Sequence, residues 1–142
     1  MLHYAINYTK VPEGIQANFL DFPGLSATAP DADTILDAAY STLIDKLMNY
    51  MEAGVPVPLP EVEPDQFYVA LLPSIVAKVL LHNMAVEQHR SRSWIASQMG
   101  VTRQVMTRLF NLRETTKVET IQNALDALGY EMNITIEPRA RT

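Results

Sequence analysis

The sequence predicts an α+β protein, in which a small antiparallel sheet with one packed helix precedes a mainly helical part that ends in a β-strand. Near the N-terminus apolar residues occupy every second position, which is the period of a half-buried strand. Between residues 35 and 50 they recur at every third or fourth position, as an amphipathic helix requires. The helical period returns from Pro73 onward, so the order is strands, one long helix, and then several helices.

Residues 1–72 are expected to form one domain with the element order ββ(β)αβ. Apolar and polar side chains alternate on both sides of "KVPEG", so residues 2–20 predict a β-hairpin, and "LSATA" is a candidate third strand. Asp33 suits the N-cap of a helix of about five turns that stops at Gly54. The four prolines of "GVPVPLPEVEP" keep residues 54–65 extended until a last strand at "QFYVALL".

Residues 73–142 are expected to form a second, mainly helical domain. Pro73 suits the first turn of its first helix. The apolar run of residues 69–86 also has about the length of a minimal membrane span. Lys78 lies within that run, and a lysine is costly inside a bilayer, so a buried helix is the preferred interpretation.

The C-terminal end predicts a helix followed by a closing strand. Thr116 and Glu119 have the spacing of a capping box, and the helix that they introduce stops at Gly129. In "YEMNITIEP" the apolar side chains then alternate, at Met132, Ile134 and Ile136. Such a strand either adds to the protein's own structure or pairs with a second copy. We favour dimerisation, because a lone strand after a helical domain needs a partner for its backbone groups.

Charge is divided unevenly along the chain. Residues 1–72 hold two Lys or Arg against ten Asp or Glu, a net charge of −8, and the remaining 70 residues hold nine against six, a net charge of +3. Such asymmetry predicts two surfaces with different partners. The absence of cysteine excludes disulfides and thiolate metal sites, and the N-terminus lacks the pattern of a signal peptide. A cytoplasmic protein without a membrane partner is therefore expected.

Residues 92–109 predict two short helices joined by a tight turn. Gly100 can adopt the positive φ that such a turn needs, and Ala96 lets the helices approach closely. The positions expected to hold the two helices together are Ile95, Ala96, Met99, Gly100, Val101, Met106 and Leu109. All of these are small or apolar, so the pattern predicts a helix-turn-helix motif.

The outward side chains of the second helix suit the edges of DNA bases. Arg103 can bond guanine O6 and N7, and Gln104 can bond adenine N6 and N7, each through two hydrogen bonds. The predicted base-reading residues are Thr102, which is also the N-cap, Arg103, Gln104, Thr107 and Arg108. The predicted phosphate contacts are Arg90, Arg92, Arg113 and Lys117. The alternative is a helical hairpin with a solvated basic face, but six Lys or Arg against one Glu in residues 88–117 favour DNA binding.

No catalytic site, metal site or cofactor motif is predicted. The three histidines, His3, His82 and His89, have no spacing that joins them to a nucleophile or to metal ligands, and His82 is expected in the core. Trp94 and Phe110 are expected in the core rather than at an interface. Four carboxylates could bind a divalent metal but are better explained as turn, cap and surface residues: Asp21, Asp31, Asp33 and Asp37.

Essentially the whole chain resembles antitoxins of the HicB family, in the subgroup with a helix-turn-helix. The resemblance rests on "FLDFPGLSATAPDADTILDAA", "LPSIVAKVLLHNM" and "IASQMGVTRQVMTRLFNLRETTKVETIQNALDALG", in which "RLFN" and "TKVETIQNALDALG" are specific. It implies a type II toxin-antitoxin system. The N-terminal domain would have a partial ribonuclease-H-like fold and bind the HicA toxin, a small basic mRNA-cleaving ribonuclease, over its active-site histidine. The C-terminal domain would dimerise and repress the operon at its operator, and the chain itself would not be an enzyme.

We therefore expect an antitoxin that occludes a HicA-type toxin and binds operator DNA as a homodimer or a tetramer. An acidic domain suits a basic toxin, because opposite charges speed association and favour a complementary fit. The toxin contacts expected around and after the Phe-Pro-Gly turn are Asp21, Phe22, Asp31, Asp33 and Asp37. Two alternatives stay open: a stand-alone repressor whose N-terminal domain senses a small ligand, and a metal-dependent nuclease.

Overall fold

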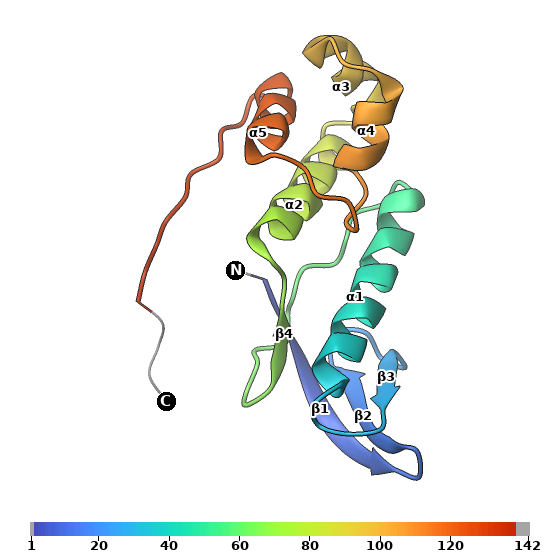
Figure 1. The fold of residues 1–142 in the computed structure, drawn as a ribbon. Helices are drawn as coiled ribbons and strands as arrows, with labels where there is room; N and C mark the ends of the chain where they lie inside the picture. Colours follow the sequence, from blue (N-terminus) through green and yellow to red (C-terminus); the bar gives the residue numbers. More distant parts are fainter. Residues whose placement is uncertain (1, 139–142) are drawn as a thin grey trace.

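The computed structural model describes residues 2–138, which form a four-stranded antiparallel sheet and five helices (Figure 1). The strands are β1 (His3–Val11), β2 (Gly14–Phe19), β3 (Ser26–Ala29) and β4 (Tyr68–Ala70), and the sheet order is β3-β2-β1-β4. The helices are α1 (Ile35–Glu52), α2 (Pro73–Glu87), α3 (Arg92–Met99), α4 (Arg103–Leu109) and α5 (Val118–Ala127). The predicted α+β class is confirmed. The predicted hairpin, the third strand and the strand after the Pro-rich segment are confirmed as well.

The hairpin of β1 and β2 depends on a glycine at the start of β2. Gly14 pairs with Val11 and has a φ of 139°, which side chains of L-residues rarely allow. A Cβ at Gly14 would lie 2.3 Å from the carbonyl oxygen of Ala29, at the end of β3. Gly14 therefore lets the hairpin turn lie directly against the neighbouring strand.

Helix α1 covers the sheet and contributes a continuous row of buried side chains. Ala39, Leu43 and Leu47 are completely buried, and the helix packs on β2, β3 and β4. The predicted N-cap at Asp33 is wrong, because Thr34 holds this position and has no side-chain cap bond. The turn before the helix is organised by Asp31 instead, whose carboxylate accepts hydrogen bonds from the backbone N–H groups of residues 33 and 34.

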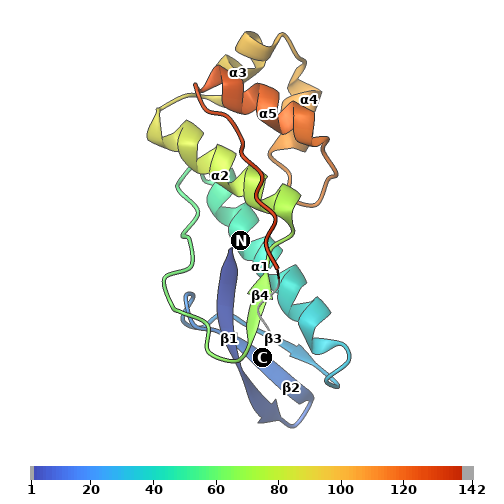
Figure 2. The same cartoon turned by 90° about the vertical axis from the view of Figure 1, so that its left-hand side faces the viewer.

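The remaining helices gather at the other end of the molecule, beyond the sheet (Figure 2). Helix α3 packs on α4 and α5, and α2 packs on α5. Pro73 opens α2 as predicted. The predicted capping box is wrong, because α5 has Lys117 as its N-cap without a side-chain bond, and the Thr116 hydroxyl is buried with no hydrogen-bond partner.

Two of the segments without helix or strand were the subject of predictions. The Pro-rich segment (residues 55–67) connects α1 to β4, as expected from its composition. The C-terminal arm (residues 131–138) runs away from α5 and joins no sheet (Figure 1). The predicted closing strand is therefore wrong for the single chain, because the arm has no neighbouring strand to supply hydrogen bonds, and Met132 N–H bonds to Gln122 Oε1 at 2.7 Å instead.

Candidate functional site

Helices α3 and α4 are held together by a small apolar frame. The predicted frame residues meet here: Ile95, Met106 and Leu109 are buried, and Ala96, Met99 and Val101 are half-buried. Gly100 is exposed at the end of α3 with a φ of 68°, the left-handed conformation that glycine adopts without strain. The turn therefore needs Gly100 for its backbone, while the other six residues fix how α4 lies against α3.

Each of the two helices begins at a hydroxyl cap. The Ser91 hydroxyl accepts a hydrogen bond from the N–H of Trp94 at 3.0 Å, and the Thr102 hydroxyl accepts one from the N–H of Val105 at 3.4 Å. Such caps satisfy backbone donors that the first turn of a helix leaves free. The predicted N-cap role of Thr102 is confirmed.

The outward face of α4 carries the side chains that sequence analysis selected. Thr102, Arg103, Gln104, Thr107 and Arg108 are all exposed. Within residues 2–138, the side chains of Arg103 and Gln104 have no hydrogen-bond or ion-pair partner. The Thr107 hydroxyl donates to the Arg103 carbonyl at 3.1 Å, and Arg108 pairs with Glu114 at 3.5 Å between exposed groups. Such an exposed ion pair contributes little to stability, and either side chain can readily take another partner.

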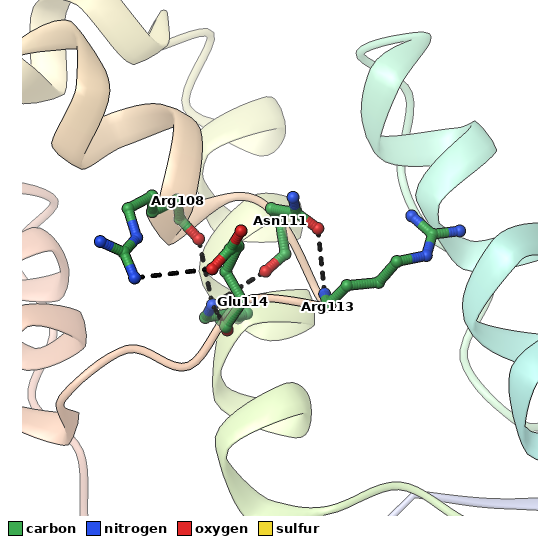
Figure 3. A network of polar contacts seen from close by, with 5 residues as sticks. Arg108, Asn111, Arg113 and Glu114 are labelled. Atoms are coloured by element: carbon green, nitrogen blue, oxygen red, sulfur yellow. Dashed lines mark hydrogen bonds and ion pairs between the residues drawn. The ribbon is translucent and has the colours of Figure 1, made fainter.

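Two of the four predicted phosphate contacts have partners inside the protein. Arg92 donates to the Met51 carbonyl at the end of α1, at 3.2 Å, and stacks on the Phe110 ring. Burial lowers the pKa of Arg92, while the nearby Glu52 carboxylate opposes that shift. Arg113 forms an ion pair with Asp45 on α1 and points toward that helix in Figure 3. Both arginines therefore join α1 to the helices beyond it.

The other two predicted phosphate contacts remain at the surface. Arg90 is exposed, with its guanidinium 4.1 Å from the centroid of the Trp94 ring. Trp94 itself is half-buried rather than in the core. Lys117 is exposed at the start of α5. The predicted core position of Phe110 is confirmed.

A buried lysine that sequence analysis did not assign to any role supports the end of α4. Lys78 of α2 is 1% exposed, and its ammonium donates to three backbone carbonyls, those of Arg108, Asn111 and Glu114, at 3.1, 2.9 and 2.6 Å. Figure 3 shows these three residues around the end of α4 and the loop that follows. Burial lowers the pKa of Lys78, with Glu114 raising it and Arg108 lowering it. The only feature of the sequence that pointed to this role was a charged residue in an otherwise apolar helix.

Two further side chains of α2 hold the Pro-rich segment. His82 is buried as predicted, and its Nε2 lies 2.8 Å from the Val55 carbonyl. Burial lowers the pKa of His82, the bond to Val55 raises it, and Arg92 lowers it. The Asn83 amide bonds both the N–H and the carbonyl of Val57, at 2.8 and 3.0 Å. These bonds anchor a segment that has no secondary structure of its own.

Most of the predicted toxin contacts are buried or form hydrogen bonds within the protein. Phe22 is buried against the rings of Tyr4 and Tyr50, so little of its side chain is available at the surface of the chain. One oxygen of Asp21 accepts hydrogen bonds from the N–H groups of residues 61 and 62, at 2.8 and 3.0 Å. The carboxylate of Asp31 likewise belongs to the turn before α1. Of the five predicted toxin contacts, Asp33 and Asp37 are the two that are exposed and have no structural role of this kind.

The predicted dimerisation residues differ in exposure. Met132 is half-buried against the helices, whereas Ile134 and Ile136 are 75% and 92% exposed. Among residues 2–138 no group of three or more His, Cys, Asp or Glu side chains could hold a metal ion. No helix in the same range is both long and apolar enough to cross a membrane.

Known proteins of similar sequence align with nearly the whole chain. No protein-family model matches it. The antitoxin HicB 1 of Photorhabdus laumondii is 31% identical over 139 residues, covering 96% of this chain and 88% of that protein. The antitoxin HicB of Escherichia coli is 29% identical over 94% of this chain and 98% of its own length, and that of Pseudomonas fluorescens is 26% identical over 96% and 95%. The chain belongs to the HicB antitoxin family.

Proposed function

We propose that this protein is an antitoxin that covers the active site of a HicA-type mRNA-cleaving ribonuclease and represses its own operon by binding operator DNA. Membership of the HicB family supports the antitoxin role. The observation that carries the DNA-binding part is the exposed polar face of α4 on a buried apolar frame. In this proposal α3 and α4 act as a helix-turn-helix, and residues 1–72 act as a toxin-binding domain of partial ribonuclease-H-like fold.

The proposed DNA contacts divide into base-reading and phosphate groups. Arg103 and Gln104 are unpaired within the described residues, so they can bond base edges in the major groove without losing internal partners. They are flanked by Thr102 at the N-cap of α4 and by Thr107 and Arg108 within the helix. Of the residues first expected at phosphates, Arg90 and Lys117 keep that role. Arg92 is proposed to act as an internal tie instead, because it bonds the Met51 carbonyl on α1 and stacks on Phe110. Arg113 is proposed to be a weaker phosphate contact, because its exposed pair with Asp45 has to exchange first.

Alanine substitutions on α4 are expected to weaken operator binding selectively. Arg103→Ala or Gln104→Ala should cost about 1–3 kcal/mol of binding free energy and relax base preference at one position. Lys117→Ala should weaken all DNA sequences alike and reduce by about one the slope of log affinity against log salt concentration. Fluorescence anisotropy with operator and scrambled duplexes at several salt concentrations measures both effects.

Arg113→Ala is the matched control for these variants. It removes the same type of side chain, but one that lies outside α4 and pairs with Asp45 on α1, so base preference should be unchanged and operator affinity should stay near the wild-type value. If Arg103→Ala also leaves operator affinity unchanged, α4 is not the recognition helix.

The toxin-binding part of the proposal is supported by charge. Residues 1–72 carry a net charge of −8, and a protein that cleaves RNA needs a basic surface for its substrate. Co-expression of the full chain with the HicA-type toxin from the same operon should restore growth, and the two proteins should co-purify. Continued toxicity with normal amounts of both proteins would leave a stand-alone repressor as the better explanation.

Dimerisation is proposed to involve the C-terminal arm. Its exposed Ile134 and Ile136 and its backbone, which joins no strand within residues 2–138, suit pairing with the arm of a second copy, as part of a dimer or a tetramer. A two-fold dimer would present two copies of α4 to a palindromic operator.

A further inference from the structure

The two ends of α4 are fixed by different parts of the fold. Its N-terminal end follows the Gly100 turn and begins at the Thr102 cap, and among the helices of residues 2–138 α3 is the one against which α4 mainly packs. Its last turn is bound from another helix, by Lys78 of α2. Helix α2 carries none of the proposed DNA contacts, so one end of the proposed recognition helix depends on a residue outside the DNA-binding surface.

Lys78 matches its three partners in number and in arrangement. An ammonium has three N–H donors and no acceptor. Three carbonyls surround it, at 3.1, 2.9 and 2.6 Å, and their residues follow one another at intervals of three: Arg108, Asn111 and Glu114 (Figure 3). Two backbone bonds create this spacing, because the Asn111 N–H bonds the Arg108 carbonyl and the Glu114 N–H bonds the Asn111 carbonyl. A lysine therefore suits this site better than an arginine, whose donors lie in one plane.

Burial makes the anchor at Lys78 difficult to release. The side chain is 1% exposed, and burial lowers its pKa. Neither ion pair of residues 2–138 includes its ammonium, so the three carbonyls are its hydrogen-bonding partners there. A charged group in a protein interior is costly without such partners. The ammonium and the last turn of α4 are therefore expected to stay together in the folded protein.

Base reading demands more precise placement than phosphate binding. A bidentate bond to a base edge requires the side chain to lie within about 0.5 Å of its productive position. Contacts to phosphates depend mainly on charge and carry no sequence information. Arg103 is the first residue of α4, and Arg108 lies in its last turn. Release of the last turn would therefore displace Arg108 more than Arg103.

We propose that Lys78 is a positioning residue for DNA recognition, which fixes the last turn of α4 so that Arg108 can read a base. Lys78 is too deeply buried to contact DNA itself. This inference rests on the proposed DNA-binding function and assigns part of its sequence specificity to a residue inside the protein.

Lys78→Met in the full chain should reduce specificity rather than DNA binding in general. The probes are a duplex from the promoter of the protein's own operon and a scrambled duplex of the same composition. Affinity for the promoter duplex should fall about tenfold, which is within the range for losing one bidentate base contact. Affinity for the scrambled duplex should stay within about twofold of the wild-type value, because Arg90 and Lys117 still supply charge for phosphates. Fluorescence anisotropy measures both affinities.

A double-mutant cycle locates the effect on α4. If Lys78 acts through the last turn, Lys78→Met should weaken promoter binding little further in a chain that already carries Arg108→Ala. In a chain that carries Arg103→Ala the two losses should multiply, since other contacts hold the N-terminal end of α4. A general loss of stability would affect both combinations alike. Equal coupling of Lys78 to both arginines would therefore overturn the proposal.

Gly14→Ala is the control matched for lost stability. A Cβ at Gly14 would lie 2.3 Å from the Ala29 carbonyl oxygen, but the hairpin that contains Gly14 is at the end of the molecule opposite α4 (Figure 1). This variant should keep the promoter affinity and the specificity of the wild type. If circular dichroism shows that Lys78→Met is unfolded, Lys78→Gln takes its place, because an amide keeps two donors. It should show the same pattern with a loss of about threefold in promoter affinity.

The possible results separate the role of Lys78 from the proposed function. A folded Lys78 variant that distinguishes the two duplexes as well as the wild type does would show that Lys78 does not position α4. The same conclusion would follow if Gly14→Ala lost as much promoter affinity as the Lys78 variant. If the wild-type chain itself binds both duplexes equally, the proposed DNA-binding function fails, and the role of Lys78 fails with it.

Discussion

Replacing Lys78 by methionine is expected to lower the free energy of unfolding by about 3 kcal/mol. Methionine has nearly the same length and fills the space, but it donates no hydrogen bond. The three carbonyls that Lys78 binds, those of Arg108, Asn111 and Glu114, would then lose a common donor in a buried site. A cation near the carboxyl end of α4 also interacts favourably with the helix dipole, and this contribution is lost as well.

Urea unfolding followed by circular dichroism measures the effect on stability. Lys10→Met is the matched control, because it removes a lysine from an exposed position on β1 and should change stability by less than about 0.5 kcal/mol. A Lys78→Met protein that unfolds at the same urea concentration as the control would show that the buried ammonium adds no net stability.

Gly14→Ala is expected to destabilise the protein by about 3 kcal/mol or more. The new Cβ would lie 2.3 Å from the Ala29 carbonyl oxygen and 2.7 Å from two backbone atoms of Pro30, so the end of β3 would have to move. The φ of 139° adds strain of its own. Because Ile15 and Ala29 are paired in the sheet, this movement also disturbs the hydrogen bonds between β2 and β3.

Gly24→Ala separates the clash from the strain. Gly24 also has a positive φ, 87°, but a Cβ there would meet no atom within 4 Å, so only the conformational cost of about 1 kcal/mol remains. Thermal unfolding of the two variants compares these costs. Equal losses of stability would contradict a clash between Gly14 and β3.

The sequence was sufficient to predict most elements of the fold, because strands and helices here depend on local periodicity. β1 and β2 lie where alternation predicted a hairpin, β3 and β4 lie at the two further strands that were expected, and Gly54, Gly100 and Gly129 follow the helices that they were expected to end. Local rules failed at the starts of two helices. The capping box before α5 did not form, and Thr34 rather than Asp33 begins α1 because Asp31 organises that turn.

The candidate site was predictable only where residue type and helical face decide the outcome. The frame of α3 and α4 and the exposure of Arg103 and Gln104 follow from spacing. The role of Lys78 could not be predicted, since its partners are 30 to 36 residues away along the chain. The same reason applies to Arg113, whose partner Asp45 is 68 residues away. The burial of Phe22 could not be predicted, because a Phe-Pro-Gly turn is compatible with either an exposed or a buried ring.

Helix α1 sets a fixed spacing between the sheet and the helices that carry α4. Along one helix, the Asp45 carboxylate binds Arg113, the Met48 sulfur accepts the Leu112 N–H, and the Met51 carbonyl accepts Arg92. The same helix packs on β2, β3 and β4. With 18 residues, α1 is a strut of about 27 Å. While these contacts persist, the sheet cannot rotate freely relative to α4, so every copy of α4 bound to a nucleic acid would hold the sheet at the same height and angle above it.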